Sequence, residues 1–304
     1  MDDSGGMMTE RSYVILEERG LVSVKGEDAR DFLQGLVSND VNKVGAGRAV
    51  HAAFMTPQGK YLHDFFIVQT GDALILDCER ADDLVRRLKS YKLRSRVELE
   101  DRTGTLAAAA LFGEGTDKAL GLDGEAGSAE SFAGGVAYMD PRLADVGARA
   151  VLERDGAAIA LRAAGFKPAA AADYDRLRLG LGLPDGSRDL IVEKAILLEN
   201  GFDELNGIDW DKGCFLGQEL TARTKHRALI RKRLMPVDIE GPAPPPGTPI
   251  LLDGGQAGEM RSARGSIGLA LMRLEHLHKA RQTGASFTAG DARLTPRKPG
   301  WAAF

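Results

Sequence analysis

A cation, a thiol, an amide and a carboxylate lie within one short stretch of this chain, at residues 212–219. In order, the stretch is Lys212, Gly213, Cys214, Phe215, Leu216, Gly217, Gln218 and Glu219. Because glycine adopts backbone angles closed to other residues, the two glycines predict a tight turn that leads into a short helix near Gln218. The unpaired amides at such a helix start can hold an anion. No apolar periodicity explains this mixture, so we interpret the stretch as a functional site.

The side chains of this stretch suit two kinds of chemistry. A cation such as Lys212 close to Cys214 favours the thiolate, which is the nucleophilic form of cysteine. Gln218 and Glu219 each offer two polar atoms in one plane, which suits paired hydrogen bonds to a planar heterocycle. A lone cysteine is more often a small buried residue, but the eight residues together favour a reactive thiol.

A turn followed by a strand, at residues 56–68, supplies a second candidate region. Alternation along the strand places Asp64 on the same face as the apolar Phe66. An acid on an apolar face either lies at a sheet edge or lines a pocket, and the sequence leaves both alternatives open. His63 points to the opposite face, and we expect it to be half-exposed rather than a catalytic base.

Two runs of cations stand out in a chain whose net charge is −4. Residues 91–96 contain three cations, which predicts a solvated helix end or an anion site. The second run has no acid between residues 220 and 237 and contains Arg223, Lys225, His226, Arg227, Arg231, Lys232 and Arg233. A solvated face is the usual explanation of such a run, and an anion-binding surface is the alternative. Without interleaved aromatic residues, direct nucleic-acid binding is disfavoured.

The composition bounds the class of protein. At 304 residues, with 43% hydrophobic and 28% charged residues, the chain is long enough for two domains with a large core. No apolar run is long enough for a membrane span, and the first residues do not resemble a signal or transit peptide. The two cysteines, Cys78 and Cys214, are too few for a disulfide framework or a four-thiolate cluster. A protein with so few cysteines is expected in the reducing cytoplasm. No metal-ligand spacing occurs, so we expect no metal site.

The pattern of apolar residues predicts an α+β fold with antiparallel sheets. We expect a hairpin at residues 13–24, strands at 50–55, 61–68 and 73–78, and a surface excursion at 113–135. Prolines between Pro236 and Pro249 mark a stiff connector, and short strands separated by glycine turns follow it. We therefore predict one domain at residues 1–235 and a small β-barrel at 236–304.

Residues 212–219 resemble the Lys-Gly-Cys-aromatic-x-Gly-Gln-Glu signature of the YgfZ family. These folate-binding proteins support iron–sulfur enzymes and are related to the glycine-cleavage aminomethyltransferase, or T-protein. The resemblance extends over most of the chain and includes residues 32–41, which are similar to the family's N-terminal segment. At Asp64 and residues 140–142 the chain is also similar to the mitochondrial iron–sulfur assembly branch.

The resemblance implies a folate-binding domain of ferredoxin-like units, a C-terminal β-barrel and tetrahydrofolate as cofactor. It implies that Cys214 is the functional thiol with Lys212 as its electrostatic partner, and that Asp64 occupies the place of a catalytic acid. The residues implied to bind the folate or shape its site are Asn39, Gln58, Asp64, Gln218, Glu219 and Arg223. The expected function is assembly or repair of iron–sulfur enzymes, with those enzymes or assembly factors as partners.

Two alternatives remain at this stage. The first is a folate-dependent transferase that moves an aminomethyl or methyl unit, with Asp64 as its acid. Against simple glycine-cleavage activity, Gly180 stands where the T-protein relatives carry a pterin-binding glutamate. The second alternative is a tRNA-binding module that uses the basic run at residues 223–233.

Overall fold

The structure is a computed structural model, and it describes residues 10–226 and 230–304. The chain divides into two compact units. The first contains the described residues up to Phe54, together with His63–Tyr174 and Asn206–Leu216. The second contains Met55–Leu62, Asp175–Leu205 and the described residues from Gly217 to Phe304.

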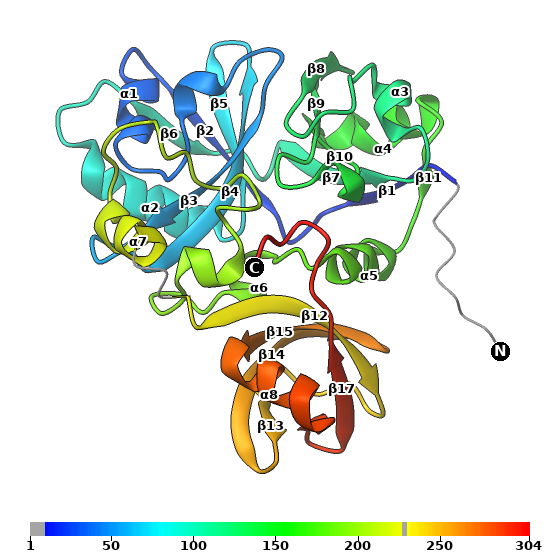
Figure 1. The fold of residues 1–304 in the computed structure, drawn as a ribbon. Helices are drawn as coiled ribbons and strands as arrows, with labels where there is room; N and C mark the ends of the chain where they lie inside the picture. The colour runs from blue at the N-terminus through cyan, green and yellow to red at the C-terminus, as the bar shows by residue number, and fades with distance from the viewer. Residues whose placement is uncertain (1–9, 227–229) are drawn as a thin grey trace. The chain divides into compact units, whose positions relative to one another are not determined.

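The first unit contains a five-stranded sheet whose strands follow the order β3, β4, β5, β2 and β6 (Figure 1). These strands are β3 (Val50–Met55), β4 (Tyr61–Thr70), β5 (Ala73–Cys78), β2 (Gly20–Lys25) and β6 (Glu98–Asp101). β-Branched and aromatic residues are frequent in β3, β4 and β2, which are buried, whereas the edge strand β6 is mostly acidic and exposed. The helices are α1 (Ala29–Gln34), η1 (Val41–Lys43) and α2 (Ala81–Lys92), and α2 packs against β2 and β6.

A six-stranded sheet completes the first unit, in the order β11, β1, β7, β10, β9 and β8. Its strands are β11 (Lys167–Pro168), β1 (Ser12–Ile15), β7 (Leu106–Phe112), β10 (Ala148–Glu153), β9 (Gly135–Met139) and β8 (Ala129–Phe132). One face carries α3 (Thr116–Leu120) and α4 (Arg154–Ala163), and η2 (Ala144–Val146) precedes β10. The other face meets the five-stranded sheet, because Val136 and Val151 share a core cluster with Phe66 and Ile75.

The second unit is built on a closed barrel with the strand order β12, β15, β14, β13, β16 and β17 (Figure 1). The strands are β12 (Lys232–Glu240), β13 (Pro249–Leu252), β14 (Gly255–Arg264), β15 (Ile267–Arg273), β16 (Phe287–Ala289) and β17 (Ala292–Pro296). Helix α5 (Ala171–Leu181) begins in the first unit and continues into the second. The other helices of the second unit are α6 (Gly186–Asp189), η3 (Leu197–Asn200), α7 (Gln218–His226) and α8 (Leu274–Thr283). Arg178 pairs with Asp189, whose carboxylate also accepts the amide of Ser262, so α6 is tied to the barrel.

The α+β class and the terminal barrel are confirmed, as are the strands at residues 50–55 and 73–78. The predicted hairpin at residues 13–24 is wrong. β1 pairs with β7 and β11, whereas β2 pairs with β5 and β6. Strands from elsewhere in the sequence thus occupy both edges of β1 and both edges of β2, so the two cannot pair with each other. The predicted excursion at 113–135 instead contains α3 and β8, a polar edge strand that periodicity did not indicate. The boundary predicted at residue 235 falls inside β12.

Candidate functional site in the first unit

Lys212 anchors the loop that carries Cys214. Its ammonium donates to the carbonyl oxygens of Gln34, Val37 and Asn39, at 2.8, 2.6 and 2.8 Å. These carbonyls lie at and just beyond the end of α1, where helix geometry leaves them without intrahelical partners. Burial lowers the pKa of Lys212 to about 8, so the group is still mainly charged at neutral pH. The structure therefore gives this cation a positioning role in addition to its charge.

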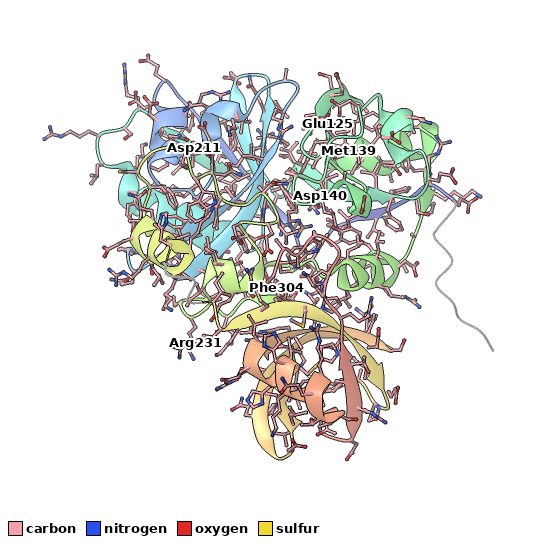
Figure 2. All side chains as sticks on the ribbon, viewed as in Figure 1. Glu125, Met139, Asp140, Asp211, Arg231 and Phe304 are labelled. Atoms are coloured by element: carbon pink, nitrogen blue, oxygen red, sulfur yellow. The ribbon has the colours of Figure 1, made fainter. Side chains whose placement is uncertain are left out.

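The loop itself is held on both sides of the cysteine. The amide of Asp209 donates to Ser38 O, and the amide of Leu216 donates to Gly35 O, both at 3.0 Å. Gly213 has a φ of 87°, in the left-handed region that favours glycine. Cys214 is exposed and free between these attachments, and Asp211 of the same loop is labelled in Figure 2. A fixed loop thus presents an accessible thiol.

Asn39 connects this loop to the interior. Its side-chain amide donates to His51 O and to Asn206 O, each at 2.7 Å, and its oxygen accepts the amide of Asp40 at 2.8 Å. Both amide hydrogens of Asn39 are therefore used inside the protein. Asn39 therefore has no free side-chain N–H group to donate to a folate. Its predicted role is limited to holding the neighbouring residues in position.

Asp64 and His51 form a buried pair. Asp64 Oδ2 lies 3.1 Å from His51 Nε2, and the two side chains are 5% and 1% exposed. Burial lowers the pKa of His51, so the ring is neutral at physiological pH and donates its Nε2 hydrogen to the carboxylate. The ring also lies 5.2 Å from that of Phe66. Lys212, Asn39, His51 and Asp64 are thus joined in one continuous series of contacts.

His63, the neighbour of Asp64 on β4, is 1% exposed, so the prediction of a half-exposed residue is wrong. Its Nε2 lies 2.9 Å from Asp83 Oδ2 on α2. Strand alternation correctly predicted that it faces away from Asp64, but it could not reveal the helix that covers this face.

The residues that sequence reasoning missed are the buried charges around Phe66. Asp77 accepts hydrogen bonds from Arg19 and from Arg149, both at 2.7 Å. Burial alone raises the pKa of Asp77, but the two guanidinium groups outweigh it and the pKa is lowered. Arg149 lies 4.3 Å from the Phe66 ring centre. The only indication of this buried charge cluster in the sequence is a charged residue inside an apolar strand, such as Asp77 in β5.

A second buried ion pair lies beside this cluster. Arg142 Nη2 donates to Asp140 Oδ2 at 2.8 Å, and the guanidinium lies 5.0 Å from the Phe66 ring centre. Asp140 directly follows β9 and is labelled in Figure 2. Burial opposes ionisation of Asp140, but Arg142 overcomes it and the pKa of the carboxyl is lowered. Residues 140–142, which resemble the assembly branch, therefore supply a buried ion pair inside the first unit.

The remaining predicted site residues lie in the second unit. A Cβ atom on Gly217 would lie 2.6 Å from Thr56 O, and one on Gly59 would lie 2.7 Å from Gly217 O. The two glycines therefore allow the turn at residues 56–59 to pack against the start of α7, which is the short helix predicted at Gln218. Gln58 at the turn is exposed and Gln218 is half-buried. This contact brings two predicted polar segments together.

Two other predicted residues form a surface pair on α7. Glu219 and Arg223 are joined by an ion pair at helical spacing, and their side chains are 81% and 51% exposed. The basic run that follows does not form one solvated face. Arg233 is 7% exposed and donates to Leu198 O and Glu204, while Arg227 lies outside the described residues.

In residues 10–226 and 230–304, no group of three or more His, Cys, Asp and Glu side chains is placed to hold a metal ion. Over the same ranges, no helix has both the length and the apolar character needed to span a bilayer.

Two families match separate parts of the chain. The family described as "GCVT N-terminal domain" matches residues 16–133, and the one described as "CAF17, C-terminal beta-barrel domain" matches residues 231–304. The crystal structure of the glycine cleavage system aminomethyltransferase T from Bartonella henselae is similar, with a TM-score of 0.74 and 13% identity. That likeness covers 97% of this chain and 87% of the other. Fold and site together define a GCVT-like protein with a terminal β-barrel.

The relatives specify the family within this class. The mitochondrial iron–sulfur cluster assembly factor IBA57 of Mus musculus is 33% identical, over 86% of this chain and 77% of its own. The Homo sapiens factor of the same name is 33% identical, over 94% and 84%. The chain therefore belongs to the IBA57 family of iron–sulfur cluster assembly factors. The predicted relation to iron–sulfur assembly proteins of the aminomethyltransferase type is confirmed, but these relatives are IBA57 factors rather than YgfZ proteins. The expected cytoplasmic location is wrong, because these relatives are named as mitochondrial proteins.

Proposed function

We propose that this protein binds a reduced folate in its first unit and assists iron–sulfur cluster assembly through the thiol of Cys214. One observation carries the proposal: the series of contacts from Lys212 through Asn39 and His51 to Asp64. It joins the loop that presents the thiol to a buried carboxylate of the GCVT-like unit. A ligand that contacts Asp64 can thereby stabilise the loop, because both depend on the position of Asn39.

The chemistry of the buried residues fits a pterin. The ring presents several N–H donors, and the carboxylate of Asp64 is an acceptor placed beside a neutral histidine. A carboxylate that accepts such hydrogen bonds in a buried site contributes specificity, because an analogue without the donors leaves it unsatisfied. Asp64 is the residue we assign to this contact. Gln58 and Gln218 remain predicted contacts, while Glu219 and Arg223 are better placed to act at the protein surface.

The two cysteines support a specific role for one of them. Cys78 is fully buried in β5, and burial raises the pKa of its thiol, so it is protected from reaction. Cys214 is exposed on a loop that the Lys212 contacts hold in place. Thiolate ligands are the usual protein contacts of iron–sulfur clusters. A single thiol is incomplete as a cluster site, so Cys214 acts together with ligands from other assembly factors or client enzymes.

The folate part is tested by calorimetric titration of tetrahydrofolate into the wild-type protein under anaerobic conditions. The Asp64→Asn variant should bind at least about tenfold more weakly, since one charged acceptor contributes on the order of 1.5–3 kcal/mol. Asp155→Asn, which changes an exposed acid on α4, is the matched control and should bind normally. Unchanged binding by Asp64→Asn, or no binding by the wild type, contradicts this part.

The thiol part is tested separately by complementation. In cells that lack the endogenous factor, Cys214→Ser should fail to restore the activities of several unrelated iron–sulfur enzymes. Cys78→Ala should restore them, because that sulfur is inaccessible. Alkylation of the folded wild type with iodoacetamide should modify Cys214 alone. Full complementation by Cys214→Ser would show that the thiol is not needed for function. That outcome would not change the result of the folate titration.

A folate-dependent one-carbon transferase is the second candidate, and the His51–Asp64 pair favours it. A neutral imidazole hydrogen-bonded to a carboxylate is an arrangement that can move a proton during transfer. The pure protein is incubated with tetrahydrofolate and either a methylamine, which can yield methyltetrahydrofolate with loss of the amine, or an aminomethyl donor, which can yield methylenetetrahydrofolate with loss of ammonia. The products are followed by mass spectrometry. Turnover that is abolished in Asp64→Asn supports this candidate, and the absence of turnover with any donor argues against it.

A further inference from the structure

A groove in the second unit lies beside α8 and takes no part in the proposed function. Its volume is 510 Å³, within the range of small-molecule sites. Leu277 of α8, Phe287 of β16 and Leu294 of β17 are among its apolar lining residues. Figure 1 shows α8 against the barrel, and the lining residues come from both.

Helix α8 leaves apolar surface available to this groove. Leu274, Leu277 and Ala280 are spaced three residues apart and so follow one side of the helix. They pack against the barrel core, yet none of the residues of α8 is fully buried. An amphipathic helix usually buries such a face completely. The incomplete burial therefore leaves an apolar surface that a ligand can cover.

The charged side chains of the lining carry one sign of charge. Arg281, Arg293 and Lys298 line the groove, and none of its lining residues is acidic. Arg293 Nη2 bonds the neutral hydroxyl of Ser286 at 2.6 Å, and Lys298 Nζ lies 5.4 Å from the ring centre of Phe304. In the described ranges, no carboxylate forms an ion pair with these three cations. In a chain of net charge −4, this is a local excess of positive charge.

We propose that this groove binds a small amphipathic organic anion, with an acyl or aromatic body on the apolar residues and a carboxylate or phosphate among the cations. The apolar body covers the exposed side of α8, and burial of apolar surface supplies most of the affinity. The three cations supply selectivity for an anionic head, because arginine matches carboxylate and phosphate oxygens bidentately. The lining of this groove includes neither Asp64 nor Cys214, and this inference does not depend on the proposed function.

The test uses the fluorescent anion 8-anilinonaphthalene-1-sulfonate and the full chain. The wild type should bind one probe molecule saturably, and decanoate or phenyl phosphate should displace it. Displacement by decanoate alone identifies an acyl carboxylate as the class, and displacement by phenyl phosphate alone identifies an aromatic phosphate. The double variant Arg281→Glu/Lys298→Glu should raise the dissociation constant at least tenfold. Arg162→Glu, on the exposed side of α4, is the matched control and should leave it unchanged.

Three results would overturn the proposal. The first is the absence of saturable binding with one probe molecule per chain. The second is equal binding by the double variant, once its thermal unfolding has shown that it folds as the wild type does. The third is displacement of the probe by stoichiometric tetrahydrofolate together with its loss in Asp64→Asn, because the probe then reports the folate site. The variant Leu277→Glu is an independent check. It should abolish binding of the anionic probe, because it replaces a half-exposed apolar residue of the lining with a carboxylate.

Discussion

Two histidine–aspartate pairs meet on strand β4 and behave differently. His63 and Asp64 are neighbours on the strand and face opposite sides of the sheet, so each has its own partner. His63 pairs with Asp83 on α2, and Asp64 pairs with His51 on β3. In both pairs the histidine is buried and its pKa is lowered by burial. The difference lies in what surrounds the carboxylate.

Asp83 lies among cations. Arg87 Nε donates to it at 2.7 Å, Arg80 Nη1 lies at 3.4 Å, and Arg86 forms a third ion pair. Burial raises the pKa of Asp83, but Arg87 and the other donors outweigh it and the pKa is lowered. Asp64 instead lies in the interior beside a neutral imidazole. The comparison separates a carboxylate held by three guanidinium groups, which stabilises the fold, from Asp64, whose buried partner is a histidine and which is the candidate for ligand binding.

The largest expected effect concerns His63 and pH. Its pKa is lowered from 6.5 to about 4, so the unfolded chain binds a proton below pH 6.5 and the folded chain only below about 4. Stability from this group is therefore complete above pH 6.5 and is lost as the pH falls from 6.5 to 4. The loss at pH 4 is roughly 3 kcal/mol. Urea unfolding at pH 7 and pH 4 should show a smaller acid-induced loss in His63→Gln than in the wild type. An identical loss in both proteins would contradict the assignment.

The next effect separates the two carboxylates. Asp83→Asn removes the charge partner of several cations and should lower the free energy of unfolding by about 2 kcal/mol. Its tetrahydrofolate affinity should equal that of the wild type, since Asp83 lies on α2 and pairs with His63, which faces away from Asp64. Asp64→Asn serves as the reciprocal variant, with weakened folate binding. If Asp83→Asn weakens folate binding as much as Asp64→Asn does, the distinction between the pairs fails.

The smallest effect concerns Asn39, which links the Asp64 pair to the cysteine loop. Asn39→Ala loses the side-chain hydrogen bonds to His51 O and Asn206 O and should destabilise the protein by about 1–2 kcal/mol. It should also increase the rate of iodoacetamide reaction at Cys214, because the loop is held less firmly. Asn42→Ala, at an exposed position nearby, is the control. A normal alkylation rate in Asn39→Ala would show that the loop is independent of the Asp64 pair.

Local residue chemistry predicted the candidate site only in part. The glycines at 213 and 217 predicted the turn and the helix that follows, since both adopt positive φ angles. The same reasoning treated Lys212 only as an electrostatic partner of the thiol. Its three carbonyl acceptors come from residues 34–39, far away in sequence, and no local pattern indicates which carbonyls remain free after α1 ends. The location of a fixed cation thus depends on packing.

The sequence by itself determined the fold class, the terminal barrel and the stretch that carries the accessible thiol. These follow from periodicity, glycine placement and the combination of residue types, which are local properties. Only the tertiary structure decided that β1 and β2 join different sheets and that Asp77 is surrounded by arginines. It also decided that the neighbouring residues His63 and Asp64 on β4 have different buried partners. The physical reason is that strand partners and buried ion pairs are chosen among residues distant in sequence, where burial and charge outweigh local preference.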